Sequence, residues 1–257
     1  MVMQQIDMNS DMGESFGKYK LGDDEEIMKY ISSANIACGL HAGDPHVLKN
    51  TIKLAKEMDT AVGAHPGLPD LMGFGRRAMD VTPDELYDYC VYQIGATQAF
   101  CAALGVPLQH VKCHGILEVM STQRPELAEA VASAVKDVDA NLLYMTIAGT
   151  KLYQTCKAAG LRVAGEVYGD RAYNDDGTLV SRKLPRSLIT DAGAVVERIT
   201  QYLDTGTMPT YEGGTVKIDA QSICMHGDTP GAAGMIKALR KKIDAKGVRV
   251  VPVGTLV

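Results

Sequence analysis

The pattern that the rest of the chain repeats is first seen in residues 5–15, which read Gln5-Ile6-Asp7-Met8-Asn9-Ser10-Asp11-Met12-Gly13-Glu14-Ser15. An apolar strand over residues 5–8 leads into acidic and amide side chains. Alternation along a strand places Asp7, Asn9 and Asp11 on one side. Burying three such groups is costly unless they bind something. We therefore expect a polar site at the carboxyl end of this strand, with a turn capped by Asp11 as the alternative.

Short apolar runs alternate with longer amphipathic segments along the chain, which is typical of βα units around a parallel sheet. We expect strands at residues 5–8, 34–37, 61–64, 110–112, 142–146, 162–166, 222–225 and 248–251. The expected helices span residues 24–32, 45–57, 82–104, 124–136, 150–159, 192–204 and 231–245. Asp44, Thr82 and Thr229 each precede a proline, and a side-chain oxygen at that place caps a helix.

Seven or eight such units fit either a closed barrel or a doubly wound open sheet. No GxGxxG or GxxxxGK[ST] motif follows the first strand, so the usual nucleotide loops of open sheets are missing. Nearly every expected strand instead ends in polar, reactive residues, as at the carboxyl-terminal rim of a barrel. We predict one (β/α)-barrel domain over residues 1–257, with seven or eight mainly parallel strands.

Composition excludes several classes of protein. The net charge is −5 and the basic residues are scattered, which argues against a nucleic-acid partner. No apolar run approaches the roughly 20 residues of a membrane span, and residues 1–5 lack the features of a signal peptide. We therefore expect a cytoplasmic location without a membrane partner. The six cysteines form no CxxC pair and are expected to be buried, reduced thiols.

Four of the six histidines follow the ends of different strands, namely His41, His65, His114 and His226. A single histidine at such a place is more often structural, but four in equivalent positions favour a shared site. His46 lies in the first turn of a helix and His110 at the beginning of a strand. We assign these two to surface or packing roles.

Lys112 lies inside an apolar strand, where an ammonium is costly without an anionic partner. It is a candidate for catalysis or anion binding, and an ion pair with Asp11 or Glu14 is the structural alternative.

Three loop arginines are further candidates for binding a carboxylate or phosphate, because guanidinium groups bind both in bidentate fashion: Arg76, Arg77 and Arg171. Exposed salt bridges explain each of them equally well. The loop over residues 168–190 is long and rich in Gly, Asp and Arg, and is a candidate lid.

Six segments together resemble the family of 5-oxoprolinase A subunits, also called LamB/YcsF: residues 9–17, 33–45, 63–67, 73–77, 170–173 and 224–231. They follow in order across almost the whole chain. The resemblance implies a distorted barrel of the glycoside hydrolase/deacetylase type. It also implies ATP-dependent hydrolysis of 5-oxo-L-proline (pyroglutamate) to L-glutamate, with ATP and Mg²⁺ and together with partner subunits B and C.

Roles for the site residues follow as hypotheses from this resemblance. Asp11 would be the general base, and His65, His114 or His226 would stabilise developing charge beside Lys112. The expected residues for a carboxylated lactam are Asn9, Glu14, His41, Arg76, Arg77, Arg171, His226 and Asp228. The deacetylase superfamily adds a divalent metal as an open alternative, with Asp11, His65 and His114 as its ligands.

One segment departs from the family pattern. Members usually read Lys-Pro-His-Gly-Ala-Leu-Tyr-Asn where this chain has Lys112-Cys113-His114-Gly115-Ile116-Leu117-Glu118-Val119. We therefore expect 5-oxoproline or a related lactam as the substrate, or else a divergent branch of the family that lacks the usual partners. Two other functions are left open: metal-dependent deacetylation of a small N-acyl compound, and non-catalytic binding of a carboxylated ligand.

Overall fold

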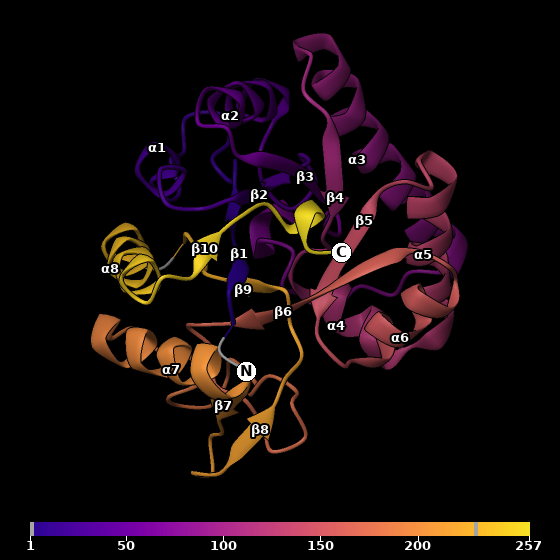
Figure 1. The fold of residues 1–257 in the computed structure, drawn as a ribbon. Coiled ribbons are helices and arrows are strands. Elements are labelled where there is room, and N and C mark those ends of the chain that lie inside the picture. Colours follow the sequence, from indigo (N-terminus) through magenta and orange to yellow (C-terminus); the bar gives the residue numbers. More distant parts are fainter. Residues whose placement is uncertain (1–2, 229–230) are drawn as a thin grey trace.

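A closed ring of parallel strands forms the centre of the protein, in a computed structural model that describes residues 3–228 and 231–257 (Figure 1). The ring consists of β1 (Gln5–Met12), β2 (Ser33–Ala37), β3 (Ala61–His65), β4 (Leu108–Val111), β5 (Leu143–Ile147), β6 (Arg162–Tyr168) and β9 (Ser222–Cys224). Each strand pairs in parallel with the next, and β9 pairs with both β6 and β1, which closes the ring. The predicted α/β barrel is confirmed.

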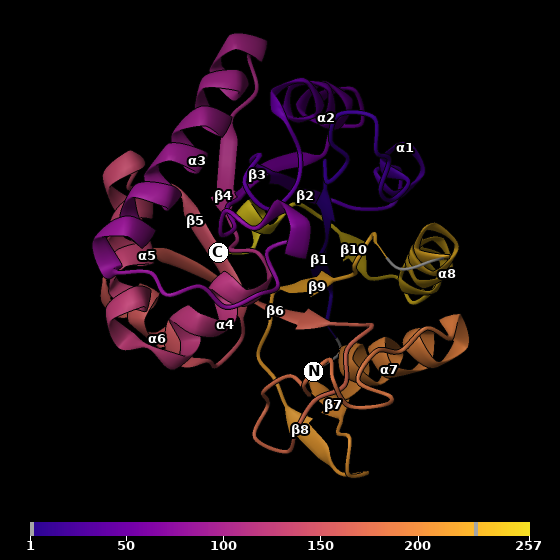
Figure 2. The ribbon, with the colours of Figure 1, turned by 180° about the vertical axis from the view of Figure 1, so that it is seen from behind.

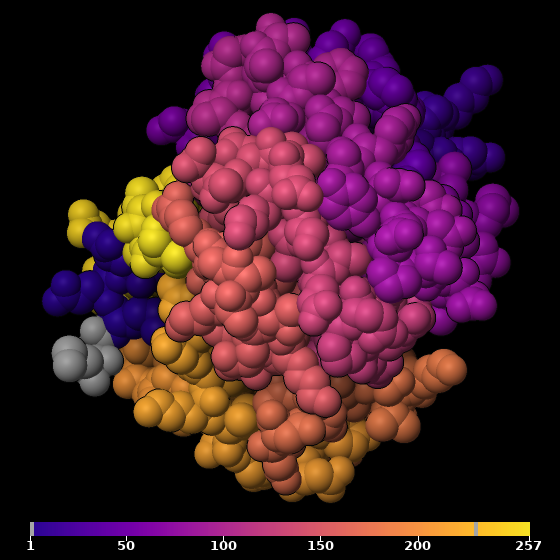
Figure 3. All heavy atoms as spheres, turned by 90° about the vertical axis from the view of Figure 1, so that its right-hand side faces the viewer, coloured from indigo at the N-terminus to yellow at the C-terminus, as the bar shows by residue number. Residues whose placement is uncertain are grey.

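Helices surround this ring on the outside (Figures 1 and 2). In the described residues they are α1 (Asp24–Ile27), α2 (Pro45–Glu57), α3 (Pro83–Leu104), α4 (Gly115–Gln123), α5 (Pro125–Val138), α6 (Lys151–Ala158), α7 (Ala192–Thr205) and α8 (Ala232–Ala245). Short 3₁₀ turns occur at Leu71–Gly73 and Val253–Thr255. Figure 3 shows the face that the magenta and pink helices cover, where α5 packs between α3 and α6.

Several elements differ from the sequence prediction. Helix α1 ends at Ile27 because the chain turns early, and the Ser32 amide already bonds to Met8 of β1. Helix α4 was not predicted, and it begins at Gly115, a residue type that is unfavourable in helices. The antiparallel hairpin of β7 (Thr207–Pro209) and β8 (Thr215–Lys217) was also missed, and it lies beside α7 outside the ring (Figure 2).

The predicted last strand is reduced to β10 (Arg249–Val250), which pairs with the start of β1.

Strand alternation divides the side chains into an apolar outer layer and a polar interior. Ile6 and Met8 of β1 point outward and belong to a core with Ile236 and Leu239 of α8. The intervening residues Asp7, Asn9 and Asp11 are buried and bond to side chains of other strands, as the sequence predicted. The apolar layer thus holds the helices in place, and the interior gathers groups that are able to do chemistry.

Helix starts carry most of the expected caps. The Asp44 carboxylate accepts bonds from the amides of His46 and Val47, and Thr82 forms a capping box with Glu85. The cap expected at Thr229-Pro230 lies outside the described residues. All six cysteines are buried, as predicted. Within the described part of the chain, none of the helices combines the length and apolar character needed to cross a membrane.

Candidate active site

A buried ammonium group joins four strands in the interior of the barrel. Lys112 follows β4 directly, and its Nζ lies 3.0 Å from Glu166 Oε2 and 3.2 Å from Asp11 Oδ1. The same nitrogen lies 3.2 Å from Asn9 Oδ1 and 3.1 Å from Cys224 Sγ. Burial disfavours the charged form, but Asp11, Cys224 and Glu166 outweigh it and hold the pKa of Lys112 well above its usual value. The predicted pairing with Asp11 is present, and Glu166 is a second partner.

Asp11 is fixed by neighbours on both oxygens. Its Oδ1 accepts bonds from Asn35 Nδ2 at 2.9 Å and from Lys112, while Oδ2 lies 3.4 Å from His65 Nε2. Burial raises the pKa of Asp11, but the charges of His65 and Lys112 outweigh it and bring this pKa well below its usual value. Asp11 is therefore an ionised carboxylate at neutral pH.

Three of the four predicted histidines meet at the carboxyl-terminal rim. His65 Nε2 lies 3.1 Å from His114 Nδ1, and the His41 ring stacks on His114 with 3.8 Å between centroids. The outer nitrogens are anchored on the backbone, since His65 Nδ1 lies 2.7 Å from Lys112 O and His114 Nε2 lies 2.8 Å from Phe74 O. Burial lowers the pKa of both His41 and His114, so these two rings are neutral.

Glu14 closes this group from the loop after β1. Its Oε1 lies 3.8 Å from His114 Nδ1 and 3.9 Å from His41 Nε2. Burial, and then the charge of Asp11, raise the pKa of Glu14 well above its usual value. Ligand atoms of Glu14, His41, His65 and His114 all lie within 4.8 Å of one another, so these four residues could hold a metal ion. Asp11, predicted as a ligand, is not among them.

Two glycines allow the histidines to pack this closely. A Cβ at Gly67 would lie 2.4 Å from His41 Nδ1. A Cβ at Gly75 would lie 2.7 Å from His41 Cβ and 2.8 Å from His114 Cδ2, and Gly75 also has a φ of +60°. Gly67 lies in the loop after β3, and Gly75 lies in the loop after the 3₁₀ turn. Both loops reach the imidazoles only because these two positions lack a side chain.

The fourth histidine forms a separate pair. His226 Nδ1 lies 2.9 Å from both oxygens of Asp170, and its Nε2 lies 3.0 Å from Arg182 Nη2. A carboxylate and a guanidinium fix the tautomer: Nδ1 donates to Asp170 and Nε2 accepts from Arg182. Burial raises the pKa of Asp170, but His226 outweighs it and the pKa is lowered. The long loop predicted as a lid supplies Arg182 to this part of the rim.

The remaining predicted anion-binding residues are engaged within the protein. Arg76 Nη2 lies 2.7 Å from Asp228 Oδ2, and both side chains are partly exposed at the rim. Arg77 bonds to Asp70 and is mostly exposed. Arg171 is buried and donates to the carbonyl oxygens of Val180 and Ser187, so it fixes the 168–190 loop. Arg76 also lies over the ring of Phe74, whose carbonyl oxygen bonds to His114, so it is close to the group of three histidines.

Several site residues were missed in the sequence. Asn35 and Glu166 point into the barrel, and Asp170 and Arg182 orient His226. Alternation along residues 33–37 and 162–168, applied as it was to β1, would have placed Asn35 and Glu166 inside. His110 is also interior, with its Nε2 2.9 Å from Asn35 Oδ1, whereas His46 is exposed.

Glu118, in the segment that departs from the family pattern, is buried on the inner side of α4. Its Oε1 accepts bonds from Thr146 Oγ1 at 2.5 Å and from the Ile147 amide at 3.2 Å. Burial, and then the charge of Glu166, raise the pKa of Glu118 to about 7. Val119 beside it is exposed. The departure therefore places an ionisable group near the interior network.

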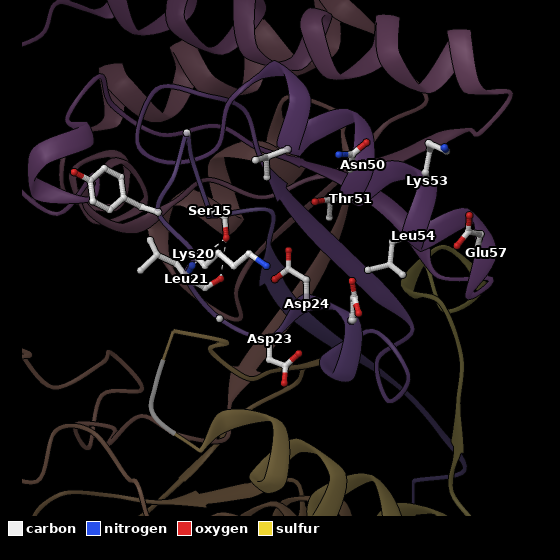
Figure 4. Close-up of a pocket in the computed structure, with 15 residues that line it drawn as sticks. Ser15, Lys20, Leu21, Asp23, Asp24, Asn50, Thr51, Lys53, Leu54 and Glu57 are labelled. Atoms are coloured by element: carbon white, nitrogen blue, oxygen red, sulfur yellow. Dashed lines mark hydrogen bonds between the residues drawn. The ribbon is translucent and has the colours of Figure 1, made fainter.

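A surface groove of about 680 Å³ lies between the β1–α1 loop and α2 (Figure 4). Its lining includes Lys20, Asp23, Asp24, Asn50 and Lys53. The histidines and Lys112 do not line it. The candidate catalytic residues therefore lie in the barrel mouth rather than in this groove.

Comparison with known proteins gives consistent results. A sequence model of the LamB/YcsF family matches residues 6–257. The A subunit of 5-oxoprolinase from Pyrococcus abyssi is 50% identical over 248 residues, which are 96% of this chain and 97% of the relative. The protein of the same name from Shouchella clausii is also 50% identical over 248 residues, 96% of this chain and 98% of the relative.

Solved structures agree with these relatives. A lactam utilization protein from Thermus thermophilus superposes with a TM-score of 0.92 at 42% identity, covering 96% of this chain and 99% of that one. A putative cellobiose-phosphate cleavage protein from Enterococcus faecalis has a TM-score of 0.61 at 12% identity and covers 99% of each chain. That second likeness concerns the fold alone.

Proposed function

This chain belongs to the LamB/YcsF family, and from that membership we propose that it is the A subunit of a multi-subunit 5-oxoprolinase. In this proposal it takes part in opening the ring of 5-oxo-L-proline, or of a close lactam, to the amino acid. Relatives named as A subunits of 5-oxoprolinase, and a structural relative named as a lactam utilization protein, support this assignment. Those relatives are named as one subunit of an enzyme, which supports the expectation of partners. We propose that these partners are subunits B and C.

ATP has a chemical role in such a reaction, because an unstrained five-membered lactam is a poor electrophile. Phosphoryl transfer from ATP, with Mg²⁺, to the lactam oxygen leaves ADP and an activated ring carbon. Water adds to that carbon, the ring C–N bond breaks to release the amine, and a second water hydrolyses the acyl phosphate. We propose that the partners carry out the phosphoryl transfer and that this chain binds the activated species in the cytoplasm.

The observation that carries the proposal is the contact of Asp11 with both Lys112 and His65 at the barrel mouth. His65 and Lys112 keep Asp11 ionised, and its Oδ2, which faces His65, would accept a proton from the attacking water. His65 and His114 lie beside it to stabilise developing charge. Arg76 at the rim is the candidate partner for the carboxylate of the substrate. Arg76 would exchange Asp228 for that carboxylate, whereas Arg77 bonds to Asp70 and Arg171 to loop carbonyls.

A second candidate function is favoured by the gathering of Glu14 with three imidazoles. Imidazole and carboxylate ligands suit the metal-dependent hydrolysis of a small N-acyl compound. The two functions differ in their need for ATP and partners. Hydrolysis of an N-acyl substrate by this chain alone, without ATP, would support the second.

The test is reconstitution with candidate B and C subunits, ATP, Mg²⁺ and 5-oxoproline, with glutamate release as the readout. We expect turnover only in the complete mixture, and a loss of about 10²-fold or more in Asp11→Asn, as for removal of a general base. Asp88→Asn, on the exposed side of α3, is the matched control and should keep full turnover. Full turnover by the isolated chain, or by the Asp11→Asn complex, would contradict the proposal.

A further inference from the structure

We propose that Glu14, His41, His65 and His114 form a divalent metal site with three nitrogen ligands and one oxygen ligand. This ligand set differs from the expected Asp11, His65 and His114. Metal binding at these residues is a property of this chain alone and does not rest on the proposed activity. Three features carry it: the hydrogen bonds on the far sides of the rings, the unpaired ring nitrogens and the charge around Asp11.

Backbone carbonyls fix the tautomers of His65 and His114. A carbonyl oxygen only accepts, so His65 Nδ1 must donate to Lys112 O and His114 Nε2 must donate to Phe74 O. In the neutral His114 ring the remaining nitrogen, Nδ1, therefore carries a lone pair, and His65 directs its own second nitrogen, Nε2, towards it. These two atoms face each other at 3.1 Å. Two nitrogens at that distance need a cation between or beside them, either a proton on His65 Nε2 or a metal ion.

His41 supplies a third unsatisfied nitrogen. The residue is fully buried, and among the described residues neither Nδ1 nor Nε2 has a hydrogen-bond partner. Buried ring nitrogens without partners are costly, and each one needs an explanation. Its ring stacks on His114, and its Nε2 faces Glu14 Oε1 at 3.9 Å. A metal bound to Nε2 would satisfy the nitrogen that points towards the group.

Glu14 supplies the anionic ligand. Its side chain is 7% exposed and faces three imidazoles without a guanidinium or ammonium at salt-bridge distance among the described residues. An ionised carboxylate buried in this way is costly without a positive partner. A divalent ion among the four residues would provide that charge while satisfying the lone pairs of the three rings.

The spacing fits a small ion after modest adjustment. Zinc bonds to imidazole and carboxylate of about 2.0–2.1 Å in tetrahedral geometry separate the ligand atoms by roughly 3.3–3.4 Å. Here His114 Nδ1 lies 3.1 Å from His65 Nε2 and 3.8 Å from Glu14 Oε1. His41 Nε2 lies 3.9 Å from the same oxygen of Glu14. Three imidazoles and one carboxylate are also a donor set that suits Zn²⁺ and similar transition ions. Such an ion would supply Lewis-acid chemistry at the barrel mouth.

Asp11 is a poor ligand in comparison. Its Oδ1 is already occupied by Asn35 and Lys112. The ammonium of Lys112 lies 3.2 Å from that oxygen and repels a second cation at this position. The ion pair therefore separates Asp11 from the metal ligands, although Oδ2 remains close to His65.

The test is titration of the chelator-treated chain alone with Co²⁺, followed by its visible absorption, and with Zn²⁺ in competition. We expect one tightly bound Co²⁺ that Zn²⁺ displaces. Glu14→Gln and His41→Ala should each weaken Co²⁺ binding at least about 100-fold, more than the loss of a residue behind the ligands. Asp11→Asn should have a smaller effect, below about 100-fold, as for a group beside a ligand rather than a ligand itself. Exposed His46→Ala is the matched control for a lost imidazole.

Glu14→Gln keeps the size of the side chain, so its fold is expected to survive, and far-ultraviolet circular dichroism checks this. Two results would overturn the inference. The first is wild-type chain that binds no stoichiometric Co²⁺. The second is a reversed order, with binding lost in Asp11→Asn and kept in folded Glu14→Gln, which would assign the ligand set expected from the superfamily. Neither result depends on glutamate release, so failure here is distinguishable from failure of the proposed activity.

Discussion

Lys112 Nζ lies 3.0 Å from Glu166 Oε2 in the interior of the barrel, where the side chains are 1% and 0% exposed. The same ammonium pairs with Asp11 at the edge of the site. One cation thus serves a structural carboxylate on β6 and a candidate base on β1. The stability of the barrel and the charge of the site are therefore expected to depend on the same residue.

Replacing this cation tests its structural role. Lys112→Met has a long side chain without the ammonium, so it leaves Asp11 and Glu166 buried without their cationic partner. Breaking a buried pair in this way is expected to lower the free energy of unfolding by about 3–5 kcal/mol. The exposed Lys53→Met on α2 should change it by less than about 0.5 kcal/mol. Urea denaturation measures both, and equal effects would rule out a special role for the buried ammonium.

Glu118 predicts a change of stability with pH. Its pKa is about 7 in the folded protein, against an ordinary value of 4.5. Because the pKa is higher in the folded than in the unfolded protein, the protonated carboxyl contributes its full stability below about pH 4.5. This stability is lost as the pH rises through 7. Glu118→Gln cannot ionise and keeps an acceptor for Thr146 and Ile147. We expect the free energy of unfolding of this variant at pH 8 to exceed that of the wild type by about 3 kcal/mol, at about 1.4 kcal/mol per pKa unit.

The measurement is the free energy of unfolding in urea at pH 5 and pH 8 for both proteins. Between pH 5 and pH 8 the free energy of unfolding should decrease less in Glu118→Gln than in the wild type. Exposed Glu57→Gln provides the control and should follow the wild-type profile. A Glu118→Gln variant that loses as much stability as the wild type would show that this carboxyl is already ionised at pH 5.

The site was predictable where regular strands determine direction. Alternation placed Asn9 and Asp11 inside, and the shared rim of a parallel barrel brought His41, His65 and His114 together. The pairing of Lys112 with an acidic residue followed from the cost of burying an ammonium. These conclusions need only the period of a strand and the desolvation of charge.

Loops gave no comparable information. Arg77 and Arg171 have the same chemistry as Arg76, yet one bonds to Asp70 and the other to loop carbonyls. No periodicity links a loop residue to its partner, so these contacts could not be derived. Helix α4 was missed for a related reason, because Gly115 with a φ of +52° stands at its first position. The separation of His226 from the other three histidines likewise depends on Asp170 and a loop arginine.

The pair of Asp170 and His226 predicts a catalytic effect in the reconstituted enzyme. Asp170 holds the Nδ1–H tautomer, which leaves Nε2 as an acceptor at the barrel mouth. Asp170→Asn offers an amide that favours the other tautomer, so we expect turnover to fall by about 10²-fold or more, within the range for acid–base groups. The exposed loop variant Asp176→Asn should keep turnover. An unchanged pH profile and kcat in Asp170→Asn would reduce this pair to a packing role.

The close approach of the Gly75 backbone to His41 and His114 predicts that a side chain at this position is harmful. Gly75→Ala and Gly149→Ala both place a side chain at positive φ, +60° and +79°, and both are expected to lose roughly 1–2 kcal/mol from this strain. Only at Gly75 would the new Cβ meet His41 and His114, at 2.7 and 2.8 Å, whereas Gly149 faces open space. Overpacking at Gly75 costs about a further 1–3 kcal/mol, so Gly75→Ala should be the less stable variant in urea. It should also lose glutamate release in the reconstituted mixture. Gly149→Ala should keep that activity at temperatures where it is folded. Equal stability and activity of the two variants would mean that the loop yields without moving the imidazoles.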